Sequence, residues 1–224
     1  RHVFVMPVIE GKELYHWGEQ YEEAGRLPPQ HVVAGVARDI LRGMVALREA
    51  HIVHTDIKPE NVLVHSAATT LDEFESMPFT ALLADFGCCC DDDEHSTDRV
   101  CTRQYQPPEA ILEAGYSFPL DMWSFGCLLF EFATCDLLFA VKAGESADSR
   151  DTDVGIELNL EHLALMMSLC GELPKRMLAR GQATRDYFSS RGRFKGGTIP
   201  PRRSLAHHLS VFGVPTDTGL VQLL

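Results

Sequence analysis

Apolar residues recur at helical spacing in the first quarter of the chain. Residues 13–24 form an amphipathic pattern, which predicts a helix that ends at Gly25. A second, longer pattern starts after Pro28-Pro29, where apolar residues recur at every third or fourth position from 33 to 47. We therefore expect a long helix whose single buried stripe packs beneath the segment that follows it.

The second half of the chain predicts two more helices. Residues 120–133 are apolar on nearly all sides, as expected of a helix at the centre of a fold. Residues 160–170 predict a short helix that Gly171 ends. Between these two helices, residues 142–159 are polar and acidic, and we expect them to form a surface insertion.

Two short apolar runs predict a pair of strands. Residues 62–64 form the first run and residues 81–84 the second. The small, polar and acidic residues 65–80 separate them, and we expect these residues to form a surface loop. If the two runs pair as a hairpin, Asn61 and Asp85, which flank the runs, are carried toward one pocket.

The composition is that of a globular protein with an acidic surface. Its 224 residues are 45% hydrophobic and 23% charged, which is enough for a real core in one domain, or two. The net charge of −12 argues against a nucleic-acid-binding surface as the main function. Residues 175–203, in contrast, carry a net positive charge. A solvated basic face is the default interpretation of this stretch, and a site for phosphorylated peptide or RNA is the alternative.

The cysteines and the apolar runs favour an intracellular protein without a membrane anchor. Seven cysteines are scattered without a Cys-x-x-Cys pair, which favours reduced thiols. Three of them, residues 88–90, are consecutive, a poor geometry for a zinc site. The longest apolar run, around 125–133, is too short to span a bilayer.

The candidate chemistry lies in residues 51–64, where Asp56, Lys58 and Asn61 stand at fixed offsets. Phosphoryl transfer needs an acid that orients a hydroxyl, a cation near the transferred phosphate, and an amide oxygen for Mg²⁺. Asp85, in Asp85-Phe86-Gly87, offers a second Mg²⁺ ligand. The competing interpretation is that these residues only cap turns, as Asp and Asn often do.

The complete set of motifs resembles eukaryotic protein kinases. It adds Thr102 ahead of Pro108-Glu109, and Asp121-Met122-Trp123-Ser124, to the residues above. Small-molecule phosphotransferases share an Asp…Asn loop, but Lys58 and Thr102 favour protein serine/threonine kinases. The resemblance implies an α+β, protein-kinase-like fold, with a mainly α-helical large lobe, a short catalytic-loop β-hairpin and most of the small lobe absent.

The resemblance also implies how the chain is divided. Residues 1–12 would be the last small-lobe strand and the hinge, and residues 13–224 a large lobe truncated at its C-terminus. The activation segment would be 85–109, with insertions at 65–80 and 142–159. No glycine-rich loop or strand lysine precedes the catalytic stretch, so we expect this fragment alone to be inactive.

Site roles follow from the same resemblance. Catalysis would depend on Asp56, Lys58 and Thr102. ATP would be bound by Met6 and Val8 in the hinge, and Mg²⁺ by Asn61 and Asp85. Structural support would come from His54, Glu109 and Asp121. Thr55 stands where phosphorylation-switched kinases carry an arginine, so we expect activity without phosphorylation of the activation segment.

Within the kinases, the chain looks most like SR protein kinases, on His54-Thr55-Asp56, Thr102-Arg103-Gln104-Tyr105 and residues 161–188. That resemblance implies basic Arg/Ser-rich substrates such as splicing factors, docked by Asp136 and Glu161. The alternatives are a LAMMER-type dual-specificity kinase, or a pseudokinase scaffold that binds basic peptides without catalysis. We expect no direct nucleic-acid or membrane partner, a monomer, and a location in cytoplasm and nucleus.

Overall fold

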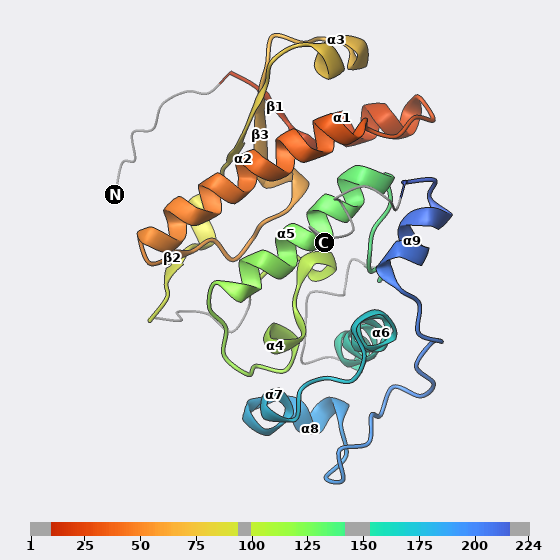
Figure 1. The fold of residues 1–224 in the computed structure, drawn as a ribbon. Helices are drawn as coiled ribbons and strands as arrows, with labels where there is room; N and C mark the ends of the chain where they lie inside the picture. The colour runs from red at the N-terminus through yellow and green to blue at the C-terminus, as the bar shows by residue number, and fades with distance from the viewer. Residues whose placement is uncertain (1–9, 94–99, 142–152, 216–224) are drawn as a thin grey trace.

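Two long helices organise the fold, which the computed structural model describes for residues 10–93, 100–141 and 153–215. Helix α2 (Gln30–Glu49) packs against helix α5 (Pro119–Thr134), and α5 lies between α2 and helix α6 (Asp153–Cys170) (Figure 1). Most side chains of α5 are buried, so the prediction of an all-round apolar central helix is confirmed. Of the predicted small-lobe strand and hinge, residues 1–12, the first nine lie outside the described residues.

Helix α1 (Leu14–Glu23) confirms the first predicted helix, with one residue fewer at each end. Leu14, Trp17 and Tyr21 are its buried residues, and they join the same core as the buried stripe of α2. Gly25 follows the helix with a φ of 60°, a left-handed conformation that glycine adopts at little cost. The chain can therefore turn sharply and enter α2 after Pro29.

The predicted hairpin is confirmed. Strands β3 (Val62–His65) and β4 (Thr80–Leu83) pair antiparallel, with Val62 opposite Leu83 and Val64 opposite Ala81. Strand β1 (Lys12–Glu13) pairs with the other edge of β3, which completes a three-stranded sheet. A second, two-stranded sheet joins β2 (Ile52–Val53) to β5 (Cys90–Asp91).

The prediction that residues 65–80 form a loop was wrong, because they contain helix α3 (Leu71–Ser76). Thr70 and Glu73 form a reciprocal capping box at its N-terminus. Phe74 is fully buried and stacks on Trp17 of α1 with ring centroids 4.2 Å apart. The buried aromatic pair explains why so short a helix is stable here.

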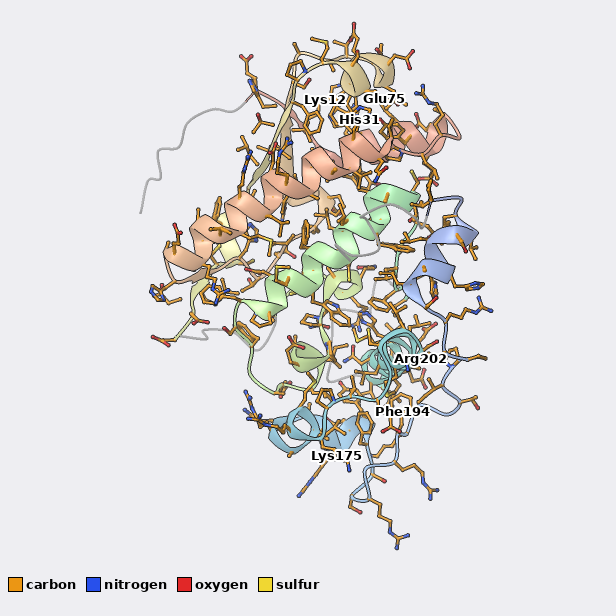
Figure 2. The ribbon with its side chains drawn as sticks, in the orientation of Figure 1. Lys12, His31, Glu75, Lys175, Phe194 and Arg202 are labelled. Carbon is orange, nitrogen blue, oxygen red and sulfur yellow. The ribbon has the colours of Figure 1, made fainter. Side chains whose placement is uncertain are left out.

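Polar contacts fix α3 to the neighbouring helices. Arg26 forms ion pairs with Asp72 at 2.9 Å and with Glu75 at 2.7 Å. The His31 ring donates to the Glu75 carbonyl at 2.8 Å, and Figure 2 shows this pair where α3 meets α2. The segment between β3 and β4 is therefore packed on α1 and α2.

The predicted start at Leu160 of the short helix 160–170 was also wrong. Helix α6 already includes Asp153, so residues 153–159 are helical and the remaining insertion residues, 142–152, lie outside the described residues. Asn159 and His162 of α6 are buried although they are polar. The predicted end is confirmed, because Gly171 follows the helix with a φ of 92°.

The other elements are short. They are helices α4 (Pro108–Ile111), α7 (Lys175–Arg180), α8 (Thr184–Tyr187) and α9 (Leu205–Val211), with 3₁₀ turns η1 (Pro59–Asn61), η2 (Phe86–Cys88) and η3 (Arg103–Tyr105). The fold is mostly helical with two small antiparallel sheets, which confirms the α+β class. Among the described residues, no helix is both long enough and apolar enough for a bilayer crossing.

Candidate active site

Asp121, in the first turn of α5, holds the backbone of the loop between β2 and β3. Its carboxylate accepts the His54 N–H at 2.8 Å and the Thr55 N–H at 2.9 Å. Thr55 needs this support, because its φ of 68° is strained for a β-branched residue. Burial raises the pKa of Asp121, although the two hydrogen bonds act in the opposite direction. Asp121 therefore bonds two successive N–H groups of the loop that carries Asp56.

Asp56, Lys58 and Thr102 form one closed group of hydrogen bonds. The Thr102 hydroxyl donates to Asp56 Oδ1 at 2.8 Å, and the Thr102 N–H donates to the same oxygen at 3.1 Å. Lys58 Nζ lies 3.2 Å from Asp56 Oδ2 and donates to the Thr102 hydroxyl at 3.0 Å. The three predicted catalytic residues are thus brought together from two segments 44 residues apart.

The surroundings keep Asp56 ionised at neutral pH. Partial burial acts to raise its pKa, but the hydrogen bonds from Thr102 and the charge of Lys58 outweigh burial. The pKa of Asp56 is therefore lower than its ordinary value. A carboxylate in this state is ready to accept a hydrogen bond from a substrate hydroxyl and then its proton.

Asn61 is oriented so that its amide oxygen is available. Its Nδ2 donates to the Asp56 carbonyl at 2.8 Å and to Asp56 Oδ2 at 2.9 Å. The amide oxygen has no hydrogen-bond partner among the described residues. The Asn61 carbonyl accepts the Ala84 N–H at 2.9 Å, so the end of β4 is tied to the catalytic loop one residue before Asp85.

Asp85 follows β4 in a left-handed conformation, with a φ of 58°. Its side chain is exposed, and Oδ1 accepts the Gly87 N–H at 3.2 Å. One carboxylate and one amide oxygen fit Mg²⁺, which is held by few protein ligands together with substrate phosphates. No cluster of three or more His, Cys, Asp or Glu side chains suited to a metal occurs in the described residues.

His54 joins the catalytic loop to the segment that carries Asp85. Its ring is fully buried, Nε2 donates to the Ala84 carbonyl at 3.0 Å, and Nδ1 accepts the Asp56 N–H at 3.4 Å. In these bonds Nε2 carries a proton and Nδ1 is an acceptor. Its ring also lies 5.2 Å from that of Phe86. His54 thus bonds both the residue before Asp85 and the backbone of Asp56.

Direct protein contacts hold residues 88–92, near the start of the predicted activation segment. The Thr55 hydroxyl donates to the Cys88 carbonyl at 2.8 Å, and β5 pairs with β2 immediately afterwards. In the acidic run that follows, Asp92 accepts the Ser117 hydroxyl at 2.6 Å. The residue that replaces the usual arginine thus makes a contact of its own with the segment.

We predict that phosphatase treatment of the full-length protein leaves its activity unchanged, because the Thr55–Cys88 bond holds the segment without a phosphate. Initial rates before and after treatment, with inhibitor-blocked phosphatase as the control, test this. Thr55→Val removes only the hydroxyl and should lower the rate about fivefold, the equivalent of one hydrogen bond. Loss of activity after phosphatase treatment would contradict the prediction.

An acidic cavity of about 250 Å³ lies beside the catalytic loop. It is formed by α1, Pro59 and the C-terminal end of α5, and its carboxyl-bearing residues are Glu19, Glu22, Glu131 and Asp136. Burial raises the pKa of Glu131 to about 7, and the charges of Glu60 and Asp136 act in the same direction. The Tyr105 hydroxyl donates to Glu131 at 2.6 Å and opposes this shift.

Only one of the two predicted docking residues lines the acidic cavity. Asp136 is exposed and lines the acidic cavity, whereas Glu161 is exposed on α6 and is not among the lining residues. Glu109 lines a different cavity of about 400 Å³ together with Arg176 and Arg180. Burial raises the pKa of Glu109, and no ion pair joins it to a described residue. The hinge residues Met6 and Val8 lie outside the described residues.

Two features of the site were missed by the sequence analysis. Glu131 is an acid in the second half of an otherwise apolar stretch of α5, a signal that could have identified it. Nothing in the sequence identified Asn159, because a single Asn in a polar stretch is not distinguished from its neighbours. It accepts Arg103 Nη1 at 2.5 Å and donates to the Tyr187 hydroxyl at 2.8 Å. It therefore links the residue after Thr102 to α6 and α8.

An ionised carboxylate braced by lysine and threonine, beside two oxygen ligands suited to Mg²⁺, is the arrangement of a phosphoryl-transferring domain. Comparison with known proteins identifies which one. The chain belongs to the protein kinase family, since the family model described as "Protein kinase domain" matches residues 1–188.

Several curated kinases are similar to the chain. "Serine/threonine-protein kinase SRPK" of Physarum polycephalum is 31% identical over 75% of this chain and 48% of that protein. "Dual specificity protein kinase CLK2" of Homo sapiens is 32% identical over 73% of the chain and 31% of that protein. "Probable serine/threonine-protein kinase sky1" of Dictyostelium discoideum is 43% identical over 50% of the chain and 16% of that protein. The chain thus spans about half the length of the first relative and less of the others.

Proposed function

We propose that the full-length protein transfers the γ-phosphoryl group of ATP to serine hydroxyls in basic, Arg/Ser-rich protein segments. The observation that carries the transfer is the group formed by Asp56, Lys58 and Thr102, in which the carboxylate stays ionised and is held by four donors, Asn61 Nδ2 included. Relatives named SRPK and CLK2 support the same class.

In the proposed reaction Asp56 orients the serine hydroxyl toward the γ-phosphorus and accepts its proton as the new bond forms. Lys58 balances negative charge on the phosphoryl group, and Thr102 keeps both side chains in place. Asn61 and Asp85 would hold Mg²⁺, which when bound neutralises charge on the ATP phosphates. The chain contributes position and fixed charge, which is most of what phosphoryl transfer requires.

The acidic cavity supports the choice of a basic substrate. It begins at Pro59, three residues after Asp56, and combines Asp136 with three glutamates. A guanidinium group that enters it would be attracted by several carboxylates at once, and planar guanidinium matches carboxylate in two-point contacts. Arginine near the phosphorylated serine is therefore the feature that we propose the enzyme recognises. Asp136 would contribute directly, and Glu161 would act at a separate point on α6.

We predict that the KM for an Arg/Ser peptide falls several-fold as the pH rises from 6 to 8. With a pKa of about 7, Glu131 is mostly neutral at the lower pH and ionised at the higher one. An ionised Glu131 attracts arginine and a neutral one does not, so binding strengthens as the pH rises. Steady-state kinetics of the full-length enzyme at several pH values measure this.

Glu131→Gln should remove the pH response of KM, because glutamine does not titrate. Glu172→Gln, an exposed acid outside the cavity, is the matched control and should preserve the response. A KM that is independent of pH in the unmodified enzyme would show that Glu131 does not contact the substrate. A pH response that persists in Glu131→Gln would assign the effect to another group.

The proposed function is tested with peptides that differ in one feature. The full-length enzyme should phosphorylate an Arg-Ser repeat peptide and fail on the same peptide with each arginine replaced by glutamate. Phosphorylation of a matching tyrosine peptide would favour the LAMMER-type alternative. Binding of the Arg-Ser peptide without phosphate transfer would instead favour a scaffold. We also propose a monomer that acts in cytoplasm and nucleus, without a nucleic-acid or membrane partner.

A further inference from the structure

The proposed substrate chemistry, a serine next to arginine, also occurs in this chain. Within the described ranges, the hydroxyl residues adjacent to an arginine are Thr102, Thr184, Ser190 and Ser204. Thr102 is hydrogen-bonded within the active site, and the Thr184 hydroxyl is buried without a partner. Two exposed serines, Ser190 and Ser204, remain as acceptors for a phosphoryl group.

Backbone structure distinguishes the two serines. Ser190 lies in a turn closed by the hydrogen bonds from Gly192 N to the Ser189 carbonyl and from Ser189 N to the Arg193 carbonyl, both 2.8 Å. Entering the cleft of another protein would require that turn to open. Ser204 instead has extended backbone angles, with φ −73° and ψ 154°.

The segment before Ser204, residues 196–203, is held to the rest of the fold by few hydrogen bonds. Residues 196–203 make no backbone–backbone hydrogen bond with any described residue, and most of them are exposed. A hydrogen bond attaches the segment to α6, because the Ser168 hydroxyl donates to the Pro201 carbonyl at 3.0 Å. Because few interactions hold it, this segment can leave the surface at a low cost in free energy.

The charge of the segment complements the acidic cavity. Arg202 and Arg203 immediately precede Ser204, both are exposed, and neither forms an ion pair with a described residue. Figure 2 labels Arg202 beside α6. In a second copy of the protein, the acidic cavity lined by Glu131 and Asp136 offers carboxylates with which these two arginines can pair. The Ser204 hydroxyl accepts the His207 N–H at 3.2 Å, and this hydrogen bond does not use the proton of the hydroxyl group.

We propose that Ser204 is a phosphorylation site on which a second copy of this protein acts, an inference that rests on the proposed function. A bond forms between Ser204 Oγ and the γ-phosphorus of ATP, and the bond from that phosphorus to the bridging oxygen breaks. The hydroxyl proton passes to Asp56 of the acting copy and then to solvent, and ADP leaves. We place the reaction between copies because Ser204 caps α9, whose end packs through Phe212 on Phe130 in the second half of α5. The catalytic loop is instead bonded to Asp121 in the first turn of that helix.

The experiment uses two full-length proteins, an active enzyme and a tagged Asp56→Asn target that cannot modify itself. After incubation with Mg²⁺ and ATP, mass spectrometry of the target should show phosphate on Ser204. Arg202→Ala/Arg203→Ala in the target should slow the initial rate about tenfold, since the charge pairs are lost while the Ser204 cap is kept. Ser210→Ala, which changes an exposed serine without an adjacent arginine, should not alter the rate.

Two peptide substrates separate failure of this inference from failure of the proposed function. Phosphate on a generic Arg-Ser peptide, but none on Ser204 of the target, overturns the inference and leaves the function standing. Phosphate on a free peptide of residues 198–208, with an unmodified target, shows that the folded segment is inaccessible and also overturns the inference. An enzyme that modifies no Arg-Ser peptide overturns both. Equal rates for the arginine variant and the parent target overturn the recognition by charge.

Discussion

Asp56→Asn in the full-length protein should lower kcat by about 10²–10⁴-fold, the range that a positioned general base contributes. Asparagine has nearly the same shape, but its amide nitrogen cannot accept a proton from the substrate. It also cannot accept hydrogen bonds from both Thr102 and Lys58, which now contact the two carboxylate oxygens. The loss should appear in kcat with the Arg/Ser peptide, measured under saturating ATP.

The same variant should still bind ATP and remain folded. Asn61 and Asp85, the proposed Mg²⁺ ligands, are unchanged, and the Asp121 bonds that hold the loop are also intact. Calorimetric titration with Mg²⁺ and ATP, and thermal unfolding, test these two points. Asp186→Asn, an exposed acid on α8, is the control and should retain full turnover. A kcat within tenfold of the parent would remove Asp56 from the role of base.

The catalytic loop was predictable because its information is local. Asp56, Lys58 and Asn61 lie within six residues, and the two strand patterns that flank Asn61 and Asp85 predicted their pairing. The contacts from Thr102 and Asp121 join segments 46 and 66 residues away from the loop. Spacing alone says nothing of such distant contacts, and only the resemblance to kinases anticipated them.

The errors concern polar segments that are stabilised by tertiary contacts. Helix α3 was missed because residues 65–80 have few apolar positions, although the pattern Thr70-x-x-Glu73 is a capping signal visible in the sequence. What stabilises the helix is the stacking of Phe74 on Trp17, a contact 57 residues away in the chain that no local pattern reveals. Periodicity detects helices that have several buried apolar residues, whereas α3 has one buried residue, Phe74.

The start of α6 was missed for a similar reason. The buried residues in its missed first part, 153–159, are Gly155 and Asn159, so the apolar pattern that marks a buried helix face is weak there. Asn159 is buried because Arg103 and Tyr187 satisfy its amide. The acidic cavity is likewise built from three separate segments, of which only the Asp136 position was anticipated.

Asp121→Ala should destabilise the full-length protein by about 3 kcal/mol or more, because it leaves two buried N–H donors, of His54 and Thr55, without an acceptor. Asp121 is only 4% exposed, so water does not readily replace its carboxylate. Denaturant unfolding measures this loss. Asp121→Asn keeps one acceptor oxygen and should lose about half as much, while the exposed Asp186→Ala should change stability by less than about 0.5 kcal/mol.

Activity should fall in Asp121→Ala for a different reason than in Asp56→Asn. Thr55 holds a strained left-handed conformation that its bond to Asp121 supports, and without that bond the loop can relax and move Asp56 away from Thr102. The Asp121 variant should therefore lose both stability and kcat, whereas the Asp56 variant should lose kcat alone. If Asp121→Ala unfolds at the same denaturant concentration as the parent but is inactive, the carboxylate acts on the reaction itself and its assignment as a support is wrong.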